Sequence, residues 1–204
     1  MKNKDDKEDK TGTQGSVRMY FRKAVCGDSD AYWQLIEPFS GLIYSVALSI
    51  LKDPELAQDI LHEVYVKAFH SLGNLLSPQS ISSWLHSITR NLCYERLRKR
   101  GRLDKKKKQI FNHKPRVVPI QEILIKEEEL QLLQKALDSL PEPFRVILGM
   151  KYMNRLKCKE IAGILDISEQ AVKSRLFEAR KLLARRMTKH KKSMRSEQNG
   201  GLRK

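Results

Sequence analysis

Apolar residues recur at helical spacing in the first half of the chain. Between residues 28 and 51 they fall one or three positions apart, at Leu35, Ile36, Phe39, Leu42, Ile43, Val46, Ala47 and Ile50. This spacing places them on one face of an α-helix. Pro38 lies within the stripe and predicts a kink or a division into two helices.

Two further helices follow in the same block. The stretch DPELAQDILHEVYVKAFHSL has Asp53 as a predicted N-cap and Pro54 at the first helical position, and it stops at Gly73-Asn74. The stretch SISSWLHSITRNLCYERLRKR predicts a helix over 80–100, with Trp84 anchoring its apolar face. Its other face is basic and carries an aromatic ring, a combination that suits phosphates and exposed bases.

The second block, residues 127–187, contains four more amphipathic or short apolar segments. Residues 101–126 separate the blocks and contain glycine, two prolines and four consecutive lysines, which predicts a flexible linker. Residues 1–16 and 188–204 are almost purely polar and predict disordered tails. The expected fold is all-α, with small helical domains at 17–100 and 127–187 joined by a flexible basic linker.

Charge indicates the class of partner. The chain has 40 Lys and Arg against 24 Asp and Glu, a net charge of +16, which favours a polyanion such as nucleic acid. Three scattered cysteines without a CxxC pair predict neither disulfides nor a zinc site and fit a reducing cytoplasm. No uninterrupted apolar run approaches the ~20 residues that cross a bilayer, and no signal peptide is recognised. A cytoplasmic protein without membrane insertion is expected.

Catalytic patterns are missing from the sequence. The five histidines form no HExxH or HxH pattern, and there is no P-loop, GxSxG or GxGxxG. We therefore expect no enzyme activity, metal, cofactor or small-molecule substrate.

Residues 160–183 have the spacing of a helix-turn-helix. Ala162 supplies the small residue where the two helices cross, and Asp166, four positions later, tolerates the positive φ of the turn. Val172, six positions further, is expected to be buried and to lock the second helix, and Ser168 to cap it. Such a helix enters the major groove with its N-terminal end first. Its candidate DNA contacts are Ser168, Glu169, Gln170, Lys173, Ser174, Arg175 and Arg180.

Longer motifs resemble a known family. LPEPFRVILGMKY, EIAGILDIS and VKSRLFEARKLL are similar to the promoter-binding C-terminal domain of bacterial sigma factors of the extracytoplasmic-function group. DPELAQDILHEVYVKAFHSL resembles the helix by which these factors bind the polymerase clamp, and SWLHSITRNLCYERLRKR the helix that melts and reads the promoter near the start site. The two matches occur in the family's order and together cover about residues 20–187.

The resemblance implies a dissociable specificity subunit of RNA polymerase. It implies binding of core RNA polymerase through Asp59, His62 and Glu63, and binding of the duplex promoter element near −35 by the helix-turn-helix. The element near −10 would be melted and read by Arg90, Asn91, Tyr94, Arg98 and the loop 73–80, with Phe69 either in the core or in the pocket wall. Partners are then core polymerase and promoter DNA, with an anti-sigma factor as a further candidate.

Three positions depart from the family pattern. His62 stands where glutamine is usual, which leaves the detail of the clamp contact open, and Asp166 stands where glycine is usual. The linker is basic where family linkers are often acidic, so it either adds DNA affinity or is a solvated tether.

The principal alternative to a sigma factor is a helix-turn-helix regulator that binds an operator without polymerase. The first block argues against it, because it shows neither a ligand pocket nor a dimer seam.

Overall fold

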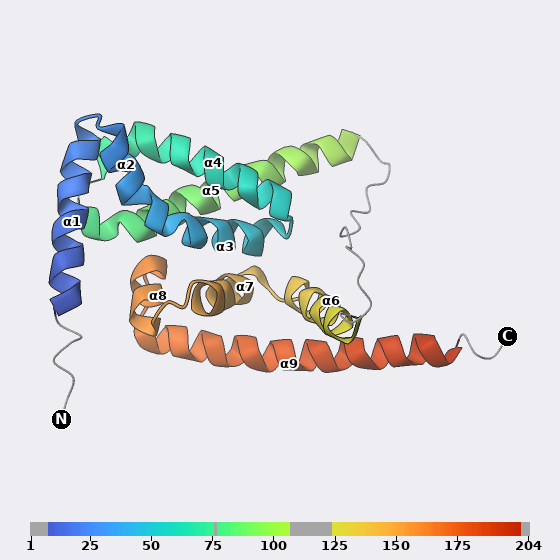
Figure 1. Ribbon diagram of the computed structural model, residues 1–204. Coiled ribbons are helices and arrows are strands. Elements are labelled where there is room, and N and C mark those ends of the chain that lie inside the picture. The colour runs from blue at the N-terminus through green and yellow to red at the C-terminus, as the bar shows by residue number, and fades with distance from the viewer. Residues whose placement is uncertain (1–7, 76, 107–123, 201–204) are drawn as a thin grey trace, which may run out of the picture.

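The regular secondary structure of the described residues is entirely helical and forms two layers. The computed structural model describes residues 8–75, 77–106 and 124–200, with side-chain burial described within 17–75, 77–101 and 130–189. In Figure 1, α2–α5 form one layer, α6–α9 lie beneath them, and α1 stands across one end. The elements are α1 (Glu8–Val25), α2 (Ser29–Ile36), η1 (Glu37–Phe39), α3 (Ser40–Leu51), α4 (Pro54–Ser71), η2 (Leu72–Asn74), η3 (Pro78–Ser80), α5 (Ile81–Lys106), α6 (Leu124–Asp138), α7 (Glu142–Leu148), η4 (Gly149–Met153), α8 (Cys158–Leu165) and α9 (Glu169–Gly200).

Side-chain caps and backbone turns fix where the first helices begin and end. The Asp28 carboxylate accepts the Ala31 N–H at 2.9 Å and starts α2. Asp53 accepts the N–H groups of Glu55 and Leu56 and starts α4, as the sequence predicts. Between them, Lys52 takes a left-handed conformation with φ 59° and ends α3. The predicted division near Pro38 is confirmed, since η1 separates α2 from α3.

The apolar stripes meet in a common core. Seven of the eight predicted stripe residues between 28 and 51 are buried, and Phe39 is partly buried against the same core. Trp84 is also partly buried against it, as predicted. Removing this apolar surface from water is the main stabilising term for the first layer. The side chains with 0% exposure in α3, α4 and α5 include Ile43, Ala47, Ile60, Val64 and Leu85.

Helices extend into stretches for which the sequence predicts disorder. The first helix, α1, begins at Glu8, inside the predicted tail 1–16. At the other end α9 continues to Gly200, beyond the predicted boundary at 188. No proline occurs in either stretch, and α9 meets no glycine before its last residue. A scarcity of apolar residues argues against burial but does not prevent helix formation.

The two layers are packed against each other. α3 lies against α7 and η4, and α5 contacts α8. Val146, Ile147 and Met150 of the second block belong to the same buried cluster as the apolar residues of α3–α5. Most of the predicted linker, residues 107–123, lies outside the described residues. The helices of the two predicted domains thus share one core in this structure.

One stretch has the length and composition of a membrane span. Within the described residues, Ser29–Leu51 has a mean hydropathy of 1.4, and 56% of its apolar window is buried inside the fold. Asp30 and Glu37 interrupt this stretch, so it does not form a continuous apolar run in the sequence. In the structure it is divided among α2, η1 and α3, and its apolar face packs into the core.

Candidate nucleic-acid interface

The predicted helix-turn-helix is present as α8, a short turn and α9. Asp166 has φ 53°, in the left-handed region, and its N–H donates to the Ala162 carbonyl. The Ser168 hydroxyl accepts the Ala171 N–H at 3.1 Å and caps α9. Ile161 and Val172 are fully buried where the two helices meet. The roles expected for Asp166, Ser168 and Val172 are confirmed.

The Asp166 turn offers a test of backbone strain. We expect Asp166→Gly to raise the free energy of unfolding by about 0.5–1 kcal/mol, because glycine adopts positive φ without a steric cost. Glu178→Gly is the matched control: residue 178 is exposed within α9, where glycine should cost about 1 kcal/mol. Urea unfolding measures both variants. A loss of stability in Asp166→Gly would show that the aspartate side chain contributes more than its backbone strain costs.

All seven predicted duplex contacts lie exposed at or near the start of α9. They are Ser168, Glu169, Gln170, Lys173, Ser174, Arg175 and Arg180. The Lys173 ammonium pairs with the Glu169 carboxylate at 2.8 Å, one helical turn away. Their mutual hydrogen bond lowers the pKa of Glu169 and raises that of Lys173. Both side chains are exposed, so Lys173 can exchange this partner for a base or phosphate at little cost.

Other side chains on α9 differ in their freedom to reach DNA. The Arg180 Nε donates to the Leu176 carbonyl at 3.1 Å, which holds the guanidinium along its own helix. Phe177, with 58% exposure, was not assigned by the sequence analysis and has the Lys181 ammonium 6.0 Å from its ring. Leu176 and Ala179 are buried, as predicted for the inward stripe. Arg175 is exposed beside the capped N-terminal turn.

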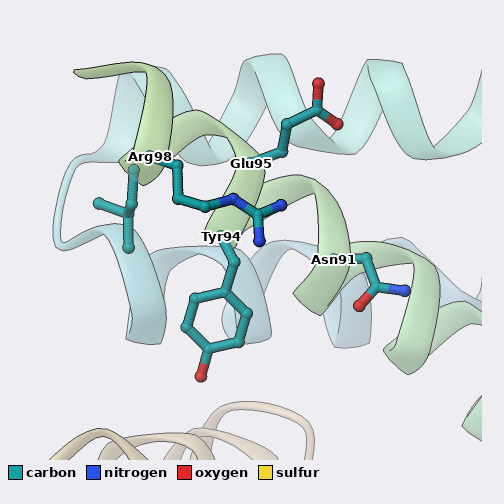
Figure 2. Close-up of a pocket in the computed structure, with 5 residues that line it drawn as sticks. Asn91, Tyr94, Glu95 and Arg98 are labelled. Atoms are coloured by element: carbon teal, nitrogen blue, oxygen red, sulfur yellow. The ribbon is translucent and has the colours of Figure 1, made fainter. Parts of the chain in front are cut away.

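Three of the predicted −10 residues line one hollow on α5. Asn91, Tyr94 and Arg98 lie there together with Glu95 and Leu97, and Figure 2 shows the Tyr94 ring pointing toward the second layer. Arg90 places its guanidinium 5.4 Å from the centre of the Tyr94 ring. The Tyr94 hydroxyl donates to Glu142 of α7, 2.7 Å from Oε1 and 3.0 Å from Oε2. Glu142 was not singled out by the sequence analysis.

Phe69 lies in a different surrounding from the α5 residues. It is on α4 with 43% exposure, and its ring packs edge to face on Tyr32 of α2 at 5.1 Å. Burial raises the pKa of Tyr32 to about 12, and its hydroxyl donates to the Tyr65 carbonyl at 2.5 Å. Trp33 extends this aromatic cluster. Phe69 is not among the residues that line the α5 hollow.

The loop 73–80 is likewise not among the residues around the α5 hollow. Gln79 instead borders a cleft between the layers, beside Pro38 and Leu42 of the first block and Lys159 and Gly163 of α8. Leu76, within this loop, lies outside the described residues. The structure therefore does not bring the described loop residues together with Asn91 and Tyr94 in one pocket.

The predicted polymerase-binding residues share one exposed face of α4. Asp59, His62 and Glu63 occupy it, and Val66, one turn further with 61% exposure, gives it an apolar edge. The spacing of three positions between Glu63 and Val66 predicts from the sequence that both lie on the same face of the helix. Glu63 forms an ion pair with Arg96 of α5. The groove between α4 and α5 is lined by both signs of charge, through Asp53, Glu55, Asp59, Glu63, Glu95, Arg96, Lys99 and Arg100.

Metal binding finds no support in the described side chains, and the Cys93 thiol is poorly suited to chemistry. No group of three or more His, Cys, Asp or Glu among them could hold a metal ion. Cys93 is fully buried, and burial raises the pKa of its thiol to about 12. The thiolate needed for nucleophilic attack or metal binding is therefore strongly disfavoured at neutral pH.

Comparisons with known proteins match both blocks. The models named "Sigma-70 region 2" and "Sigma-70, region 4" match residues 35–103 and 130–183. RNA polymerase sigma factor SigV of Bacillus subtilis is 31% identical over 152 residues, 72% of this chain and 84% of SigV. The ECF sigma factor SigE of Mycolicibacterium smegmatis is 29% identical and the probable sigma factor RfaY of Xanthomonas campestris 30%, each over 77% of this chain. The chain spans 62% of SigE and 40% of RfaY.

The fold agrees with this assignment. CnrH, solved in complex with the cytosolic domain of CnrY, superposes with a TM-score of 0.59 at 20% identity, over 83% of this chain and 95% of that one. Helices alone among the described residues, a helix-turn-helix and matches to both sigma-70 regions define a protein of the sigma class. The chain belongs to the sigma-70 family of RNA polymerase sigma factors, in the extracytoplasmic-function (ECF) group.

Proposed function

We propose that the chain binds core RNA polymerase and directs it to promoters in the cytoplasm, without being an enzyme itself. The main support for this proposal is that one chain has two exposed surfaces suited to these two partners. One is the exposed acidic and apolar-edged face of α4, and the other is the exposed N-terminal face of α9. Each lies within the matching sigma-70 region.

In this proposal the two blocks bind different promoter elements, and the first block also binds core polymerase. Residues 17–100 bind core polymerase through α4 and capture unpaired bases of the −10 element with the Asn91, Tyr94 and Arg98 surface of α5. Residues 127–187 read the −35 duplex with the first turns of α9. In such a helix, lysine contacts guanine and glutamine contacts adenine, while arginines hold phosphates.

An anti-sigma factor is a further proposed partner. The sigma factor RpoE of Bartonella quintana was solved in complex with the anti-sigma factor NepR, and its chain superposes on this one with a TM-score of 0.58. The exposed α4 face that would bind polymerase is also accessible to a competing protein. Release from such a partner would then free the chain for transcription.

The direct test is co-elution with bacterial core polymerase on size exclusion, followed by promoter selection with the resulting holoenzyme. A stable complex that initiates from selected promoters is the expected result. If the chain bound duplex DNA without associating with core polymerase, the operator-binding regulator would replace the proposal.

The docking face has its own test. Replacing Asp59 and Glu63 together by alanine should weaken core binding about tenfold, because two charges facing a basic coiled coil contribute about 1–2 kcal/mol in total. Asp30→Ala with Glu178→Ala is the matched control, since it removes two exposed acids elsewhere. A fluorescence competition assay measures both affinities. Equal affinities for the two double variants would place the docking face elsewhere.

A further inference from the structure

The last helix continues well beyond the part of it that belongs to the helix-turn-helix. α9 is 32 residues long, and the region 4 match ends at residue 183. Among the described side chains of α9, Leu182 and Leu183 are the last that pack against the core. Figure 1 shows the C-terminal end of α9 extending beyond α6. Residues 184–200 therefore add about 25 Å of helix that these apolar contacts do not support.

This end of the helix carries charge of a single sign. Between 179 and 196 the sequence has no Asp or Glu. The same stretch has eight Lys and Arg, namely Arg180, Lys181, Arg185, Arg186, Lys189, Lys191, Lys192 and Arg195. Lys181, Arg185 and Lys189 are exposed, and none of them forms an ion pair with a described side chain. By contrast, Lys99 and Lys173 each have a carboxylate at 2.8 Å, one helical turn away.

Such a segment is a poor helix by itself. Lys181, Arg185 and Lys189 follow one another at a spacing of four, and like charges at this spacing destabilise a helix. The segment also lacks a wide apolar stripe, since Met187 and Met194 are the only large apolar residues between 184 and 200. A polyanion that binds the helical form relieves the repulsion and stabilises the helix by mass action. The segment therefore favours an anionic polymer as its ligand.

The sequence of this segment favours nucleic acid over an anionic membrane. A helix that lies on a membrane needs a broad apolar face, typically with Trp, Phe or Leu. Met187 and Met194, seven positions apart, offer too little apolar surface for that. Binding to the phosphates of a nucleic acid requires only accessible cations. Nucleic acid is therefore the ligand that matches both the charge and the missing apolar face.

The position of these cations relative to the first turns of α9 also suits duplex DNA. At about 1.5 Å per residue, Lys181 lies about 12 Å along the helix from Lys173, and Lys189 lies about 24 Å from it. The major groove is about 12 Å wide. When α9 lies in the groove with its first turns on base edges, Lys181 is therefore level with the phosphates at the groove edge. The cations that follow lie outside the base pairs that the helix reads.

We propose that residues 181–195 form a basic arm that binds nucleic-acid phosphates irrespective of base sequence and holds duplex DNA beside the −35 element. The location beside the −35 element rests on the proposed function, whereas phosphate binding itself does not. Each neutralised phosphate adds a salt-dependent contribution to the affinity. The arm also attracts DNA before contact and so raises the association rate. The first turns of α9 supply sequence recognition, and the basic arm adds affinity.

The test neutralises the basic arm in the full chain. Lys181→Gln, Arg185→Gln and Lys189→Gln are combined, because glutamine has nearly the same helix propensity as lysine and arginine. A second variant exchanges lysine and arginine at the same three positions and so keeps the charge. Fluorescence anisotropy measures binding to a duplex of scrambled sequence, without polymerase, over a range of salt concentrations. Circular dichroism checks that the helix content of the variants is retained.

The neutralised variant is expected to bind the scrambled duplex about tenfold more weakly at about 0.1 M salt. The slope of log affinity against log salt concentration should also become shallower by about 2–3, because each phosphate contact contributes about 0.9 to it. The charge-preserving variant should bind like the wild type, since the arm recognises phosphates by charge. A charge-preserving variant as weak as the neutralised one would overturn the proposal.

Three cations on α1 provide the matched control. Arg18→Gln with Arg22→Gln and Lys23→Gln removes three exposed cations far along the chain from the arm, and its affinity should stay within about twofold of the wild type. Equal losses in the two neutralised variants, or no loss in the arm variant, would overturn the proposal. Unchanged duplex affinity with lost binding to vesicles of phosphatidylserine and phosphatidylcholine would assign the arm to a membrane instead. None of these measurements needs polymerase, so failure of the arm is distinct from failure to bind core.

Discussion

Replacing Lys173 and Arg175 together by alanine is expected to weaken binding of the −35 duplex about 100-fold, because a base or phosphate contact of this kind contributes about 1–3 kcal/mol. Both side chains are exposed in the first two turns of α9, beyond the Ser168 cap. Because the proposed function assigns these side chains to the major groove, their loss should not affect core binding. Gel-shift titration with holoenzyme and a selected promoter measures the change.

A matched control separates this effect from a general loss of charge. Arg18→Ala with Lys23→Ala removes two exposed cations from α1, far along the chain from α9. The duplex affinity of this control variant should stay within about twofold of the wild-type value. The salt dependence of its affinity should also fall less than in the variant that lacks Lys173 and Arg175. Equal losses in the two double variants would mean that binding reflects overall charge and that α9 is not the reading helix.

Sequence spacing predicted the helix-turn-helix because its determinants are local. Asp166 adopts positive φ, Ser168 caps the next helix and Val172 is buried, and all three lie within seven residues of one another. The Asp53 cap of α4 was predictable for the same reason. Turn and cap geometry depends on the nearest few residues and is therefore visible in sequence.

Contacts between the blocks could not be predicted in this way. Glu142 and Tyr94 are 48 positions apart, and nothing in either segment indicates that they meet. Phe69 was left open between core and pocket, and only the packing of α2 on α4 places it against Tyr32. The helical extent of α1 and α9 was missed because polar composition was taken to mean disorder. Each of these features depends on tertiary packing or helix continuation, which periodicity alone does not determine.

The buried side of the helix-turn-helix provides the second large expected effect. Ile161→Ala should lower the free energy of unfolding by about 2–5 kcal/mol, because it removes three buried carbons and leaves a cavity between α8 and α9. Ile161 of α8 and Val172 of α9 both have 0% exposure. Leu130→Ala is the control: it also removes three carbons, but Leu130 is 67% exposed, so its cost should stay below about 0.5 kcal/mol. Urea titrations followed by circular dichroism compare the two. Similar small losses in both variants would mean that α8 and α9 repack around the missing side chain, and that burial at Ile161 does not hold the reading helix in place.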